Sequence, residues 1–129
     1  MSTIKILVIS IVMLVLAGCQ RVQPIMNIEN TPITYSLQKE QVKSAILQAA
    51  INRGWTIEDK SASELTARIH VRSHHAEVKI PYNEKHYSII YVDSSNLKAK
   101  SGNIHRNYNR WVNNLNLDIQ KQFSLESSQ

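Results

Sequence analysis

Three histidines within six residues form the part of the chain best suited to chemistry: His70, His74 and His75. Neutral imidazole is a common ligand of zinc and copper, and the nearby Glu77 could add a carboxylate. Three cations in the same stretch would surround and repel a divalent ion: Arg68, Arg72 and Lys79. We therefore expect no bound metal and no cofactor. The alternatives are a solvated polar face, an interaction surface whose positive charge rises below about pH 6.5, and a metal site.

Aromatic residues supply a second set of candidates for binding. Trp55, Tyr82, Tyr108 and Trp111 follow the apolar phase of the expected strands and helix, which predicts that they are buried. Two other tyrosines are expected to stay partly exposed, and such amphipathic side chains are enriched at interfaces. The candidate interaction surface therefore has seven members: Arg68, His70, Arg72, His75, Glu77, Tyr87 and Tyr91.

Motifs that carry catalysis are missing from the sequence. It contains no Gly-x-Ser-x-Gly, no glycine-rich phosphate loop and no His-Glu-x-x-His pair. The basic residues are spread along the chain, unlike the clustered pattern of a nucleic-acid-binding surface. We therefore expect a protein that is not an enzyme and has no nucleic-acid partner.

The start of the chain has the parts of a secretory signal. A charged Met1–Lys5 precedes the apolar run Ile6–Leu16, which ends in Leu16-Ala17-Gly18-Cys19. The apolar run is too short to span a membrane, which takes about 20 residues. This segment resembles a bacterial lipoprotein signal peptide, residues 1–18.

The resemblance implies a lipid anchor and a location. Cleavage follows Gly18, Cys19 receives a diacylglyceryl group on sulfur, and the new amino group is acylated with a chain such as palmitate. In the lipoproteins that this signal resembles, aspartate after the cysteine favours the inner membrane. Gln20 therefore indicates the outer membrane of the cell envelope, facing the periplasm.

Composition limits what remains after cleavage. Removal of residues 1–18 takes Lys5 from the 15 Lys and Arg and leaves 14 against 10 Asp and Glu, a net charge of +4. The remaining length suits one domain. Cys19 is the only cysteine, so no disulfide is expected and the core alone must hold the fold.

The hydrophobic pattern predicts one domain over residues 36–124. Residues 19–35 are expected to be the acylated cysteine and a tether, part of which lies against the domain as an edge strand. Helical spacing predicts helices over 36–53 and 104–123, the first capped by Ser36. Alternation predicts strands over 55–57, 65–71, 76–82 and 86–92, followed by a loop over 93–103, and residues 125–129 are expected to fray. The fold class is then α+β: a two-layer sandwich in which both helices pack on one face of a four-stranded antiparallel meander.

The central hairpin has the clearest predicted register. If Val71 faces Ala76, every apolar side chain of the two strands lies on one face of the sheet. The same register sets His70 opposite Glu77. In the last helix, Asn109 is expected to bond back to the loop at 93–96 or to line a pocket.

Two further motifs carry a resemblance over most of the mature chain. Arg53-Gly54-Trp55 follows the first helix, and Tyr108-Asn109-Arg110-Trp111-Val112 lies in the last one. They resemble those of small uncharacterised bacterial lipoproteins, which implies a fold but no activity. We expect a lipid-anchored, non-enzymatic interaction module whose partner is an envelope protein or cell-wall component. The alternative is a lipoprotein that binds a small ligand or metal.

Overall fold

The structure is a computed structural model that describes residues 21–129; residues 1–20, with the predicted signal peptide and Cys19, lie outside the described residues. Among the described residues, no helix combines the length and apolar character needed to cross a membrane. The elements follow one another as β1 (Val22–Pro24), β2 (Ile28–Pro32), α2 (Lys39–Asn52), β3 (Thr56–Ser61), β4 (Glu64–Val71), β5 (His74–Pro81), β6 (His86–Ser95), β7 (Asn103–His105) and α3 (Arg106–Ser127).

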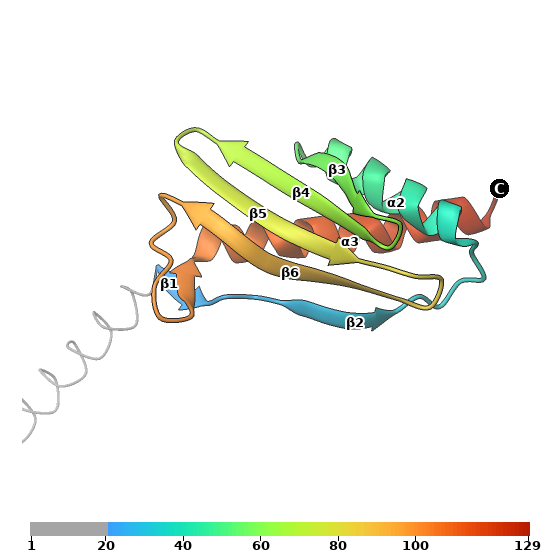
Figure 1. The fold of residues 1–129 in the computed structure, drawn as a ribbon, viewed down its shortest axis with the longest axis horizontal. Helices are drawn as coiled ribbons and strands as arrows, with labels where there is room; N and C mark the ends of the chain where they lie inside the picture. The colour runs from blue at the N-terminus through green and yellow to red at the C-terminus, as the bar shows by residue number, and fades with distance from the viewer. Residues whose placement is uncertain (1–20) are drawn as a thin grey trace, which may run out of the picture.

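Five strands form one antiparallel sheet in the order β2-β6-β5-β4-β3, and β1 pairs separately with β7. The long helix α3 runs behind this sheet, and the β1–β7 pair lies at one end of the molecule (Figure 1). The predicted α+β class, with an antiparallel sheet and two helices, is confirmed. The predicted four-stranded meander is not matched, because β2 adds a fifth strand beside β6.

The core lies between the two helices and one face of the sheet. Alternate residues of the central strands are buried there: Leu65, Ala67, Ile69, Ala76, Val78 and Ile80. Helix α2 contributes Val42, Ala45, Ile46, Ala49 and Ala50, all fully buried. Its first turn begins after Gln38 rather than at the predicted cap Ser36, because Oε1 of Gln41 accepts the backbone N–H of Gln38 at 2.9 Å.

Helix α3 is displaced along the chain from its predicted range of 104–123. Ile104 belongs to β7, where it pairs with Gln23 of β1, and the helix therefore begins at Arg106. It continues to Ser127, so most of the segment expected to fray is helical. The buried side of the helix is formed by Tyr108, Asn109, Val112, Leu115, Ile119 and Phe123. Trp111, predicted to be core, is only partly buried at the edge of this stripe.

The predicted register of the central hairpin is wrong by two residues. Val71 pairs with His74, His70 with His75 and Ile69 with Ala76. Only Arg72 and Ser73 are left for the turn, and Arg72 adopts a φ of 58°. A positive φ at the first turn residue matches the strand twist in a two-residue hairpin. Because a two-residue shift preserves the period of the strand, the buried face is still the predicted one.

Strand β6 is longer than the predicted range of 86–92. It extends to Ser95 through a bulge, since Val78 pairs with Tyr91 whereas Glu77 pairs with Asp93. Val92 is the extra residue of the bulge, which lets the strand continue beside β5 through residues expected to form a loop.

The segment expected to be a tether with an edge strand is part of the domain, and β2 lies at the edge of the five-stranded sheet. Strands β1 and β2 lie in it, and Ile25 and Met26 pack against the core. Asn109 of α3 holds this segment: Oδ1 accepts the backbone N–H of Met26 at 2.9 Å, and Nδ2 donates to the carbonyl of Pro24 at 2.9 Å. The expected bond from Asn109 to the loop at 93–96 is therefore wrong. The strand pairs and the core described above all fall within residues 21–129, so a chain that starts at Gln20 retains them.

We predict that Asn109→Ala destabilises the protein by about 1–3 kcal/mol, because it leaves two backbone groups of the first segment without partners. Urea unfolding measures the loss, and hydrogen exchange should show the Met26 amide losing protection. The matched control is Asn113→Ala, an exposed position of the same helix, which should change stability by less than about 0.5 kcal/mol. Equal stability of the two variants would contradict this role of Asn109.

Candidate functional site

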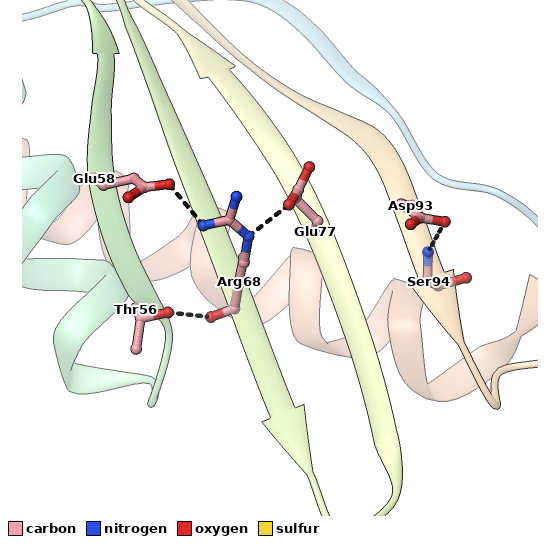
Figure 2. A network of polar contacts seen from close by, with 6 residues as sticks. All are labelled: Thr56, Glu58, Arg68, Glu77, Asp93 and Ser94. Carbon is pink, nitrogen blue, oxygen red and sulfur yellow. Dashed lines mark hydrogen bonds and ion pairs between the residues drawn. The ribbon is translucent and has the colours of Figure 1, made fainter.

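The outer face of the sheet carries a network of fixed charges. Arg68 of β4 lies between a carboxylate on each neighbouring strand, with Nη1 2.7 Å from Oε1 of Glu58 and Nε 2.6 Å from Oε1 of Glu77 (Figure 2). These hydrogen bonds raise the pKa of the Arg68 guanidinium above its ordinary value. Since the two carboxylates already neutralise Arg68, it is poorly suited to bind a free anion. Lys79, exposed on the same face, is available for that role.

The observed register sets the histidines differently from the prediction. His70 faces His75, with ring centroids 4.5 Å apart and planes tilted by 39°. The predicted pair of His70 with Glu77 is wrong, because Glu77 lies opposite Arg68. Arg72 is in the turn and therefore does not face His75 across the strands.

The third histidine of the group is used structurally. Nδ1 of His74 donates to the carbonyl oxygen of Asn96 at 2.7 Å, since a carbonyl can only accept. Among residues 21–129, no group of three or more His, Cys, Asp or Glu side chains is arranged to hold a metal ion.

The two tyrosines of the candidate surface are not on this face. Tyr87 is 1% exposed, contrary to the prediction, and its hydroxyl donates to Oδ1 of Asn116 at 2.5 Å. Burial raises the pKa of the Tyr87 hydroxyl. Tyr91 is partly buried, packs edge-on against Tyr108 at 5.4 Å between ring centroids, and bonds through its hydroxyl to Ser94. Both rings therefore stabilise the layer between sheet and helix.

The outer face of the sheet is open. Both helices pack on the opposite side, and no element among residues 21–129 covers this one (Figure 1). It presents charged, imidazole and aliphatic side chains from three central strands: Arg68, His70, His75, Glu77, Lys79 and Ile90. Of the seven predicted site residues, Arg68, His70, His75 and Glu77 are brought together here, while Arg72 lies at the hairpin tip.

One functional feature was missed by the sequence analysis. His105 precedes α3 and caps it, with Nδ1 accepting the backbone N–H of Asn107 at 3.1 Å. Burial lowers the pKa of this imidazole, and the nearby charges of Arg106, Lys98, His74 and Arg21 lower it further. Arg21 and Lys98 therefore lie close enough to His105 to act on its pKa, although they are far from one another in the sequence. The one feature of the sequence that indicated this positive charge is the absence of Asp and Glu from residues 94–117.

Comparison with protein-family models, with curated proteins and with solved structures found no significant match in any of the three.

The cap formed by His105 predicts a pH dependence of stability. Because its pKa is lower in the folded than in the unfolded protein, the unfolded state binds more protons between these two values. The stabilisation is complete above the unfolded value of about 6.5. It is lost as the pH falls through the lower folded pKa.

Asn is a good cap that does not titrate, so His105→Asn should keep the helix stable at neutral pH. We predict that the variant loses less free energy of unfolding than the wild type between about pH 7.5 and about pH 5.5. Urea titrations at the two pH values measure this difference. Parallel losses in both proteins would show that His105 is not responsible.

Proposed function

We propose that this chain is a lipid-anchored protein of a bacterial cell envelope, acylated at Cys19 and attached to the outer membrane on its periplasmic side. The observation that carries the proposal is Leu16-Ala17-Gly18-Cys19 directly after the apolar run Ile6–Leu16. One acyl chain binds a bilayer marginally, whereas two or three hold a protein there essentially permanently.

The short distance from the anchor to the domain supports this arrangement. Strand β1 begins at Val22, three residues after Cys19, and a fully extended segment of that length spans at most about 11 Å. An anchor at Cys19 therefore holds the domain directly at the bilayer surface, without a long flexible stalk.

The domain itself is proposed to be a non-enzymatic binding module that uses the outer face of its sheet. The mixed charges of Arg68, Glu58 and Glu77 are fixed by ion pairs, while His70 and Lys79 extend into solvent beside them. Such a surface suits a polar partner with groups of both signs, namely an envelope protein or a cell-wall polymer.

The lipid anchor is tested by mass spectrometry of the protein purified from its native membrane. The mature protein should begin at Cys19 with a diacylglyceryl group and an N-acyl chain, and Cys19→Ser should accumulate with residues 1–18 attached. An intact Met1 or a free Cys19 thiol on the wild-type protein would contradict the proposal.

The binding face is tested by site-specific photocrosslinking in cells. A photoreactive residue at position 70 should crosslink to a defined envelope component, because His70 is exposed on the outer face. The control is position 117 on α3, where the leucine is 55% exposed but lies on the helical side of the sheet. The same products from both positions, or lipid alone from position 70, would contradict the proposed face.

A further inference from the structure

The excess positive charge of the domain lies at the end where its first strand begins. Six exposed cations define this basic end: Arg21, Arg72, Lys98, Lys100, Arg106 and Arg110. They come from the start of β1, the β4–β5 turn, the segment between β6 and β7, and the first turns of α3. In Figure 1 these elements meet at the same end of the molecule.

Backbone hydrogen bonds hold the first strand, the β6–β7 segment and the start of α3 together. The carbonyl of Arg21 accepts the N–H of Arg106 at 2.8 Å, which joins the start of the described chain to the start of α3. The N–H of His105 donates to the carbonyl of Leu97 at 2.8 Å, which fixes the segment that carries Lys98.

Side-chain contacts add the hairpin tip to the same end. Nδ2 of Asn96 donates to Oγ of Ser73 at 2.7 Å, next to Arg72 in the turn. Nδ1 of His74 donates to the carbonyl of Asn96 at 2.7 Å. The tip of the β4–β5 hairpin is thus attached to the β6–β7 segment, and its arginine joins the other cations.

The three segments that form this end contain no acidic residue. Residues 21–28, 70–76 and 94–117 carry six Lys and Arg and no Asp or Glu, whereas the rest of residues 21–129 carries eight Lys and Arg and ten Asp and Glu. The formal charge is therefore +6 at this end and −2 elsewhere. The dipole of α3 adds a partial positive charge at the N-terminus of this helix.

The charges of the basic end are not neutralised within the domain. The ion pairs found among residues 21–129 use three other cations, Lys43, Arg53 and Arg68. Burial is the main cause of the lowered pKa of His105, and the charges of Arg106, Lys98 and Arg21 lower it further. Beside them Val22 presents an apolar side chain that is 40% exposed. A concentrated, exposed and unpaired positive surface fits a partner with dense negative charge.

We propose that the basic end is a membrane-docking surface for anionic lipid headgroups. The choice of a lipid partner rests on the proposed anchor, because Cys19 lies only two residues before Arg21 and its acyl chains would hold this end at the bilayer. Headgroup phosphates then neutralise the six cations, and the sheet and helices extend away from the membrane. The outer face of the sheet stays accessible from the side.

The test uses residues 20–129, which keep the whole core and lack Cys19, so binding is measured without the anchor. Cosedimentation compares phosphatidylcholine vesicles with phosphatidylcholine–phosphatidylglycerol vesicles at low salt. The wild type should bind only the anionic vesicles, and added salt should weaken binding because it screens charge. Lys98→Glu/Lys100→Glu/Arg106→Glu should lower the affinity by more than about 100-fold.

A variant of equal net charge is the matched control. Lys60→Glu/Lys85→Glu/Lys121→Glu changes three exposed lysines away from the basic end, and it should bind within about threefold of the wild type. Lys98→Gln/Lys100→Gln/Arg106→Gln should have a vesicle affinity between those of the wild type and the charge-reversed variant. It keeps the test valid if the charge-reversed variant misfolds. Circular dichroism melts confirm that each variant is folded.

Three results would overturn the proposal. They are equal weakening by the basic-end and control variants, no preference for anionic vesicles, and tighter binding of the wild type to single-stranded DNA than to the vesicles at the same salt. None of them bears on acylation, because the fragment lacks the cysteine. Failure of the docking surface is therefore distinguishable from failure of the lipid anchor.

Discussion

The architecture depends on the one-sided burial of the sheet. In β4 and β5 every second residue is apolar, and the residues between them are charged or polar. Only one face of the sheet can therefore be buried. Both helices must pack on that face, because their own apolar stripes must also be buried. The opposite face therefore stays open and carries Arg68, Glu58 and Glu77 as an ion-paired set of charges (Figure 2).

The second constraint is the attachment of the first strand of the domain to β7 and α3. Strand β1 pairs with β7, and Asn109 binds the backbone of Pro24 and Met26 from the first turns of α3. Through these contacts residues 22–26 are held against β7 and α3, next to the basic end. A lipid attached at Cys19 would therefore control which end of the protein meets the membrane as well as its distance from it.

Sequence reasoning predicted what depends on local periodicity. The alternation through Leu65, Ala67 and Ile69 identified the buried face correctly, and helical spacing identified both helices. The hairpin register failed because a shift of two residues buries the same face, and only the left-handed φ of Arg72 decides between the two. Tyr87 was expected to stay partly exposed, but α3 buries it. Its hydrogen-bond partner Asn116 is 29 residues away in the sequence, so no local pattern predicts this burial.

Contacts between distant segments could not be predicted from local sequence patterns. Asn109 and Met26 are 83 residues apart, and no local rule links them. The basic end is assembled from three acid-free segments whose cations look scattered when read in order. Only the tertiary contacts that bring Arg21 to Arg106 and Ser73 to Asn96 turn this scatter into a single charged surface.

The most direct test measures how close two positions of the domain lie to the bilayer. It uses the complete, acylated protein reconstituted into anionic bilayers. A spin label or fluorophore is attached at position 98 in the basic end or at position 85 in the β5–β6 turn, and a lipid-bound paramagnetic quencher reports its distance from the bilayer. The account predicts strong quenching at position 98 and little at position 85. Equal quenching at both positions, or stronger quenching at position 85, would contradict a domain that an acylated Cys19 holds with its basic end against the membrane.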